Sequence, residues 1–512
     1  MLMFVLLITI SGCQQQPQYD ADDAIPESSI DLFSPIDGAL IRETWDVHTI
    51  GKSKVGHRRV RDYQIGEPPN HKIRRLAEDF LHIRRFGQIS EQSLKMVSLE
   101  SSTGEVLQLA YEVESGGQSR RFTGHIRGDQ LLLHSSGSGD SKSKTLTWSP
   151  DNGGFFAVQN SLTQRPLQPG ERRTVSVFLP IVDRVGRLDL VAHDFEDTEL
   201  LSGRRRLLRV EVHAGDNVND EIYWIDEHGE IIKFAHNSTI DTTYRADESA
   251  AMRPNDTTVI DVALDVRVPL EKPFPAARQM KRAEYRVTLA RDKPAELFAT
   301  SDFQQVIAES DRVARLIVTA SNAGRDNLNS RTTSPQPTDS DLLPNHWIQS
   351  DDPRVRALAE AAAGSRDDPG EIALALEQYV HRTVRTVDFR QILASAAEVV
   401  RQRRGDCSEQ AVLLAAACRA REIPARVVVG LVYAPQQTAF LYHMWNEVWT
   451  GDRWLPLDAT LGQGLVGPDH IKLTDGSLSE KTAYELLSAV NRVVGQLGIE
   501  LLSTDDGSGL DF

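Results

Sequence analysis

Cys407, His443 and Asp458 follow one another along the chain in the order of a thiol-based catalytic triad. A cysteine becomes a nucleophile when an imidazole takes its proton and a carboxylate orients that imidazole. Taken singly, each residue has a simpler explanation, because buried thiols, strand histidines and aspartates before turns are usually structural. Together they predict catalysis, provided that the elements carrying them bring the side chains into contact.

The segment that begins at Cys407 predicts the helix that such a nucleophile needs. No helix breaker occurs before Pro424, which gives a helix of about four turns. Asp406 is a suitable N-cap, and Glu409 places a carboxylate in the first turn. Residues 411–418 are all apolar, so we expect the helix to be buried. Unpaired backbone N–H groups at its start favour the thiolate form of a cysteine placed there.

Cys418 lies on the same predicted helix and provides an internal comparison. It lies roughly 16 Å further along the helix axis than Cys407, which excludes a disulfide between the two. Alanines precede it, so we predict a small core residue there rather than a second nucleophile.

Two strands and a hairpin are predicted after the helix. Residues 425–433 are rich in valine and predict a buried strand, residues 440–450 predict the next strand, and turn residues separate them. Gly451 and Asp452 suit a two-residue hairpin turn that leads into residues 453–458. The base and the carboxylate therefore lie on neighbouring strands.

The hairpin register predicts that His443 and Asp458 meet. If Thr450 pairs with Arg453, Asp458 lies opposite Trp445, on the face of the strand that also carries His443. The Cβ atoms of such diagonal neighbours lie about 7 to 8 Å apart, within reach of a hydrogen bond between the two side chains.

The residues around the triad resemble the transglutaminase-like superfamily, particularly its bacterial members regarded as cysteine proteases. The resemblance covers about residues 350–473 and implies a papain-like α+β domain in which Cys407, His443 and Asp458 form the triad. The family often has Asp-Pro-Thr where this chain has Asp458-Ala-Thr, and the aspartate is retained. The matching sequences are Ser395-Ala-Ala-Glu-Val-Val, Arg403-Arg-Gly-Asp-Cys, Ile423-Pro-Ala-Arg, His443-Met-Trp-Asn-Glu-Val and Leu457-Asp-Ala-Thr.

A triad of this kind acts on peptide or carboxamide bonds. The thiolate attacks the carbonyl and forms a thioester, and an amine or ammonia leaves. Water then gives hydrolysis and an amine gives transamidation, and the sequence does not decide between them. The Cys407 backbone N–H is expected to be one donor to the oxyanion, and the second donor is not identified.

Composition and charge narrow the possible partners. A chain of 512 residues predicts two or three domains. A net charge of −16 and a pI near 5.4 argue against nucleic acid as a partner. We expect a protein or peptide substrate, and the oligomeric state stays open.

The first residues predict export and a lipid anchor. Residues 1–12 are apolar but too short to span a bilayer, and they resemble a signal peptide. Ile10-Ser-Gly-Cys13 resembles a bacterial lipobox, so Cys13 is the predicted lipidation site. The absence of a basic segment before the apolar run suggests that the native start lies upstream. The expected location is the bacterial cell envelope, with the membrane as a second partner.

The remaining sequence predicts an α+β protein with a mostly antiparallel β region before the catalytic domain. Residues 107–113 alternate between apolar and polar side chains, and residues 221–234 predict a hairpin. A final helix is predicted near residues 479–496. The predicted divisions are a signal peptide (1–12), a lipidated polar tether (13–40), a β-rich domain (41–250), a second small β segment (255–320), a linker (321–349), the transglutaminase-like domain (350–502) and a tail (503–512).

No cofactor and no obligatory metal are expected. Residues 216–221 and 505–507 have calcium-like compositions but lack the loop spacing of a calcium site. The fourteen histidines do not cluster with the three cysteines at zinc spacing.

Two functions therefore remain open. The first is a membrane-tethered thiol enzyme, and the second is a non-catalytic envelope lipoprotein whose β region binds lipid, glycan or protein. The completeness of the triad favours the enzyme.

Overall fold

The structure of the protein is a computed structural model. It describes residues 32–34, 38–85, 88–115, 118–137, 140–180, 184–214, 218–236, 241–254, 261, 265–320, 335–385, 394–479, 486, 489–490 and 492–506. These residues fall into two compact units, one within residues 15–260 and the other within residues 261–512. The predicted lipidation site, Cys13, lies outside the described residues.

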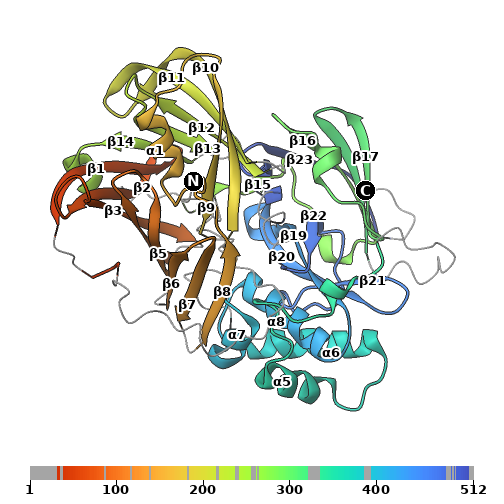
Figure 1. The fold of residues 1–512 in the computed structure, drawn as a ribbon. Coiled ribbons are helices and arrows are strands. Elements are labelled where there is room, and N and C mark those ends of the chain that lie inside the picture. Colours follow the sequence, from red (N-terminus) through yellow and green to blue (C-terminus); the bar gives the residue numbers. More distant parts are fainter. Residues whose placement is uncertain are drawn as a thin grey trace. The chain divides into compact units, whose positions relative to one another are not determined.

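The first unit is one antiparallel sheet of fourteen strands, drawn from red to yellow-green in Figure 1. Consecutive strands pair from β1 to β8 and from β9 to β14, and β1 pairs with β14 at the centre, so β8 and β9 are the two edge strands. This confirms the predicted antiparallel β region, including the hairpin of β12 and β13. Its strands are β1 (Ala39–Ile50), β2 (Ser53–Ile65), β3 (Lys72–Arg85), β4 (Gln88–Ser101), β5 (Val106–Ser115), β6 (Gln118–Arg127), β7 (Gln130–Gly137), β8 (Asp140–Thr147), β9 (Arg172–Leu179), β10 (Arg184–Leu200), β11 (Gly203–Ala214), β12 (Val218–Ile225), β13 (Ile231–His236) and β14 (Asp241–Ala246).

Two short helices, α1 (Ala157–Gln164) and α2 (Glu248–Met252), accompany the first sheet. Val158 and Leu162 of α1 are buried among apolar side chains of β9 to β13. One face of these strands is therefore covered by the helix, as the alternating sequence pattern requires.

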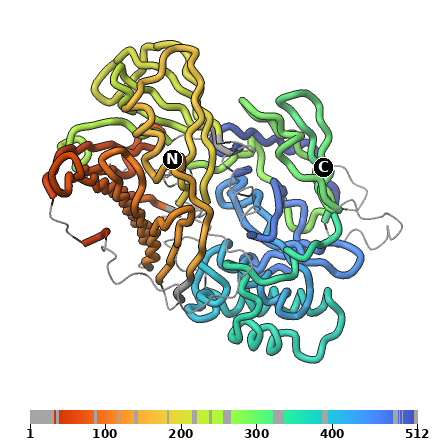
Figure 2. The backbone as a smooth tube through the Cα atoms, viewed as in Figure 1, coloured from red at the N-terminus to blue at the C-terminus, as the bar shows by residue number. Residues whose placement is uncertain are grey.

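The second unit contains helices and two smaller sheets, and its chain is drawn from green to blue in Figure 2. The alternation of helices and antiparallel strands gives the predicted α+β class. Its helices are α4 (Pro294–Leu297), α5 (Pro353–Ala363), α6 (Pro369–Thr383), α7 (Ala396–Gln402) and α8 (Cys407–Ala420), with 3-10 turns η2 (Ala277–Gln279), η3 (Asp339–Asp341) and η4 (Pro435–Gln437). Its strands are β15 (Val268–Pro269), β16 (Arg282–Leu289), β17 (Gln304–Ser310), β18 (Val313–Thr319), β19 (Ala425–Ala434), β20 (Ala439–Trp449), β21 (Trp454–Leu457), β22 (His470–Gly476) and β23 (Leu497–Asp505).

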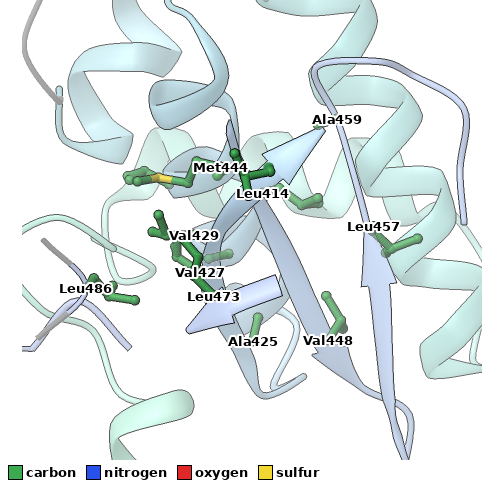
Figure 3. Packing of buried hydrophobic residues seen from close by; sticks show 14 of the residues in the cluster. Leu414, Ala425, Val427, Val429, Met444, Val448, Leu457, Ala459, Leu473 and Leu486 are labelled. Carbon is green, nitrogen blue, oxygen red and sulfur yellow. The ribbon is translucent and has the colours of Figure 1, made fainter. Parts of the chain in front are cut away.

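Helix α8 packs against the sheet that contains β19, β20 and β22. Its residues 411–418 are apolar, and the helix is buried from Glu409 to Arg419, as the sequence predicted. Figure 3 shows Leu414 of this helix close to Met444 of β20 and Val429 of β19. Asn446 of β20 also donates its side-chain N–H to the Ala411 carbonyl at 2.9 Å. The nucleophile helix is thus fixed to the strand that carries His443.

The sequence placed residues 255–320 in a separate β segment, and the structure corrects this division. Strands β16 to β18 join β23 in one four-stranded sheet, and β15 pairs with β20 of the catalytic sheet. The predicted boundary at residue 502 falls inside β23. Pairing of β16 with β23 joins segments about 200 residues apart in sequence, which local sequence patterns do not encode.

Among the described residues, no helix is both long enough and apolar enough to cross a membrane. Half of the predicted final helix, 479–496, lies outside the described residues. The described apolar residues within it, Leu486, Val490, Val493 and Val494, are buried in the core of the second unit.

Gly430 of β19 should tolerate no side chain. A Cβ atom there would lie 2.2 Å from the Ile471 carbonyl oxygen and 2.5 Å from the Trp445 ring. We expect Gly430→Ala to lower the free energy of unfolding by about 1 to 3 kcal/mol, as other overpacked cores do. Denaturant unfolding of the purified protein measures this change.

Gly370→Ala provides the matched control. This glycine lies in α6, where an added Cβ would approach only the movable Asp368 side chain at 3.2 Å and the Thr450 side chain at 3.7 Å. Alanine favours helix over glycine, so stability should stay the same or rise slightly. Equal losses in the two variants would contradict the packing argument.

Candidate active site

Cys407 is the first residue of α8 and is partly exposed. Asp406 caps the helix, because its carboxylate accepts the Ser408 backbone N–H at 2.9 Å. Glu409 completes a capping box by accepting the Asp406 backbone N–H at 2.8 Å. The preceding Gly405 packs directly on Glu409, since a Cβ at Gly405 would lie 2.2 Å from the Glu409 Cβ. The residues around the cysteine thus build and fix the helix start.

Glu409 also affects the charge beside the thiol. Burial and then the neighbouring charge of Asp406 raise the pKa of Glu409 well above its ordinary value. Its other oxygen accepts the Ala394 backbone N–H at 3.0 Å. Burial and the charge of Asp406 therefore favour the neutral form of the Glu409 carboxyl at the helix start near Cys407.

His443 and Asp458 are in direct contact. His443 donates from Nε2 to Asp458 Oδ2 at 2.8 Å, and both side chains are buried. The predicted hairpin register is confirmed, because Trp449 pairs with Trp454 and Asn446 with Leu457. Asp458 follows directly after this last pair.

Cys407 also lies close enough to His443 for the two side chains to interact electrostatically. Because Nε2 is engaged with Asp458, Nδ1 is the ring nitrogen left available to the thiol. Burial disfavours the charged ring, but Asp458 and Cys407 outweigh it and raise the pKa of His443 to about 10. The structure thus brings together the three residues that the sequence singled out, in an arrangement that favours the charged form of the His443 ring beside Asp458.

The turn after Asp458 holds this carboxylate by its other oxygen. Asp458 Oδ1 accepts the Thr460 backbone N–H at 2.8 Å. Helix α6 fixes the same turn, because His381 donates from Nδ1 to the Ala459 carbonyl at 2.9 Å and Glu377 accepts the Gly464 backbone N–H at 3.1 Å. Burial alone would raise the pKa of Asp458, but His443 and His470 lower it well below the ordinary value.

His470 and Asp469 belong to the site but were not singled out from the sequence. His470 donates from Nε2 to Asp458 Oδ2 at 3.2 Å and from Nδ1 to Asp469 Oδ1 at 2.9 Å. Burial opposes its charge, yet Asp469 and Asp458 raise the pKa of His470 to about 9. A signal was present in the adjacent Asp-His pair at the start of an alternating apolar and polar stretch, but only the pairing of β22 with β19 places it beside the hairpin.

Trp445 closes the buried side of this group. Its ring stacks on His443, with centroids 6.2 Å apart, and meets His470 edge-on at 5.2 Å. Trp445 packs with Val428 and Val466 in a small buried cluster. These apolar contacts keep water from the imidazole rings and strengthen their interactions with Asp458.

The structure also contains one arrangement with metal-like geometry among the residues it describes. Ligand atoms of His443, Asp458 and His470 lie within 4.8 Å of one another. A cation there would have to displace the ring protons that both histidines donate to Asp458. Binding of a cation by these three side chains and donation of both ring protons to Asp458 are therefore mutually exclusive.

Cys418 has the environment of a core residue. It is fully buried in α8, and burial raises the pKa of its thiol to about 12. The two described cysteines therefore differ in access, and only Cys407 has an imidazole partner among the interactions of the described residues.

Comparison with known proteins identifies the family of this segment. Residues 356–459 match the model of the transglutaminase-like superfamily. The match begins in α5 and ends directly after Asp458, so it contains all three triad residues. No curated protein matches the chain.

Three solved structures have weak similarity. A "putative cysteine protease" from Cytophaga hutchinsonii is 18% identical, covers 46% of this chain and 93% of its own, and has a TM-score of 0.29. A DUF1089 family protein from Pseudomonas aeruginosa is 14% identical over 34% of this chain and 87% of its own, with a TM-score of 0.21. A TGase is 18% identical, covers 32% of this chain and 44% of its own, and has a TM-score of 0.19.

Alkylation should distinguish the two described cysteines. Iodoacetamide at neutral pH is expected to modify Cys407 at least about tenfold faster than Cys418, because only the first is accessible and paired with an imidazole. Peptide mapping by mass spectrometry measures both rates. In a His443→Ala variant the rate at Cys407 should fall, while Cys418 stays unreactive. Slow, equal labelling of both thiols would count against an activated Cys407.

Proposed function

We propose that this chain, through its transglutaminase-like segment, is a membrane-tethered thiol enzyme that acts on peptide or carboxamide bonds. The proposal rests above all on the contact chain from Cys407 through His443 to Asp458 at the start of a buried helix. The family match over the same residues supports an enzyme of this kind.

The acylation half of the reaction uses all three side chains. His443 takes the thiol proton from Cys407, and the thiolate attacks the substrate carbonyl carbon. The backbone N–H of Cys407, at the helix N-terminus, is the proposed donor to the oxyanion. When the C–N bond breaks, the imidazolium gives its proton to the leaving amine or ammonia, which leaves a thioester on Cys407.

The deacylation half reverses these proton transfers. Neutral His443 removes a proton from water or from an acceptor amine, which attacks the thioester carbonyl. Water yields a carboxylic acid, and an amine yields a new amide. The imidazolium then returns its proton to the departing thiolate of Cys407. Asp458 stays ionised throughout and keeps the imidazole ring in place.

Tethering to a membrane is proposed from the N-terminal sequence. Ile10-Ser-Gly-Cys13 suits lipidation of Cys13, and the glutamine-rich stretch after it suits a polar tether. A lipidated terminus of this kind would hold the catalytic unit in the cell envelope, where peptide and protein substrates are available.

The non-catalytic alternative stays a prediction from the sequence. It would require that the β1 to β14 unit bind a lipid, glycan or protein, and no side-chain arrangement among that unit's described residues identifies such a ligand. The thiol chemistry of Cys407 separates the two functions experimentally.

Trapping the thioester tests the proposed chemistry. The purified protein is incubated with envelope extract, quenched in acid and analysed by mass spectrometry for an acyl group on Cys407. Cys407→Ala should lose the adduct and lower turnover by roughly 10⁴-fold or more, because the nucleophile is removed. Cys418→Ala is the matched control and should keep both. An adduct that persists in the Cys407→Ala variant would refute the assignment.

Metabolic labelling with a radioactive fatty acid tests the tether. The full chain expressed in bacteria should incorporate the label and fractionate with membranes, since the fatty acyl chains carried by a lipidated Cys13 bind the bilayer. Cys13→Ala should remove the label and release the protein into the soluble fraction, whereas Cys418→Ala should change neither. Unlabelled, soluble wild-type protein would contradict lipidation at Cys13.

A further inference from the structure

Two imidazole rings share one oxygen of the triad carboxylate. Asp458 Oδ2 accepts from His443 Nε2 at 2.8 Å and from His470 Nε2 at 3.2 Å. Its other oxygen is held by the Thr460 backbone N–H. Asp458 is 0% exposed and His470 only 2% exposed, so the arrangement is built inside the protein. A simple triad needs only the first of these imidazoles.

The second imidazole is itself held by a carboxylate. Asp469 accepts from His470 Nδ1 at 2.9 Å and is also buried. Its other oxygen lies 3.7 Å from Nε of Arg278, whose side chain is half-exposed. The contacts therefore form one chain of alternating charge from Cys407 to Arg278, which ends at the protein surface.

Backbone contacts on both sides fix the segment that carries this second pair. The Tyr433 backbone N–H donates to the Asp469 carbonyl at 2.8 Å. The hydroxyl of Tyr285 donates to the Pro468 carbonyl at 2.6 Å. Tyr285 belongs to β16, in the region that the sequence had assigned to a separate segment. Residues before the linker thus help to hold His470 against Asp458.

Charge counting shows what the second imidazole contributes. Before the reaction, thiolate and imidazolium at Cys407 and His443 balance each other. Once the thioester forms and the leaving group has taken its proton, both of these groups are neutral. Asp458 would then be a buried carboxylate without its partner charge, which is costly. A charged His470 balances it, while Arg278 balances Asp469.

We propose that His470, oriented by Asp469, is a positioning residue that keeps Asp458 ionised and in place while His443 is neutral in the acyl-enzyme. The inference rests on the proposed thiol chemistry and deepens it. Its effect is specific to deacylation, because that is the half of the cycle in which His443 begins without its proton.

A buried histidine between carboxylates is not by itself a sign of catalysis. His236 in the first unit contacts Asp241 at 2.8 Å and Glu221 at 3.4 Å and is equally buried, but no triad residue adjoins it among the described residues. Its pKa is raised to about 10, despite burial, by the same kind of partners. His236 is therefore the matched control for the loss of one buried charge.

His470→Gln in the full chain tests the inference, because glutamine keeps an N–H group and removes the charge. We expect kcat to fall about tenfold while kcat/KM changes little, since a supporting partner of a catalytic group typically contributes this much. The thioester on Cys407 should accumulate. Asp469→Asn should lower kcat less strongly, again with little change in kcat/KM. His236→Gln should change neither quantity.

The pH dependence gives a second readout, which needs no substrate. The charged or titratable groups around His470 are Asp458, Asp469 and His443, with Arg278 and Tyr285 beyond Asp469. His470 helps to lower the pKa of Asp458, so its removal raises that pKa toward the ordinary value. The pH below which the rate of Cys407 alkylation falls should therefore be about one unit higher in His470→Gln than in the wild type.

Each outcome has a defined meaning. The inference would be overturned if a folded His470→Gln protein had the same kinetics and the same pH profile of alkylation as the wild type. A zinc ion found in the purified wild-type protein but not in His470→Gln would also overturn the inference. His443, Asp458 and His470 would then hold a cation rather than two protons. Absence of any thioester in the wild type would refute the proposed function instead, and the alkylation profile would still test His470.

Discussion

The buried carboxylate of Asp458 is the constraint on which the second unit depends. A carboxylate removed from water costs several kcal/mol unless hydrogen bonds and opposite charges replace its hydration. Here the replacement comes from the turn at Thr460, from His443 on β20 and from His470 on β22. Three segments must therefore be correctly placed before this one side chain is satisfied. The same contacts that stabilise the carboxylate also orient the base toward Cys407.

Much of this arrangement follows from local sequence. The helix start at Asp406 and Cys407 is encoded by a capping box and an apolar run, both of which act over a few residues. The contact between His443 and Asp458 follows from a hairpin whose two-residue turn fixes the register. Such features depend on neighbours in the chain, so their prediction needs no knowledge of the fold.

The remaining part of the site depends on pairing between distant segments. His470 reaches Asp458 only because β22 pairs with β19, and nothing in its own strand specifies that partner. The residues before the linker were set apart for the same reason, although β15 extends the catalytic sheet and Tyr285 supports the His470 segment. Polar residues on such strands have the same local pattern whether they face solvent or a buried carboxylate, so the sequence alone did not reveal them.

Buried charge elsewhere in the same sheet shows why the triad needs a different solution. Arg426, Glu447 and Lys472 form a network with Asp475, with contacts of 2.6 to 2.8 Å, and none of these charges has to change. Such a network can be satisfied once, during folding. The triad must be satisfied in two states, because Cys407 and His443 lose their charges together when the thioester forms. The charged His470 ring on the far side of Asp458 keeps the buried charges balanced in both states. His443 alone cannot do this, because its own charge changes during the reaction.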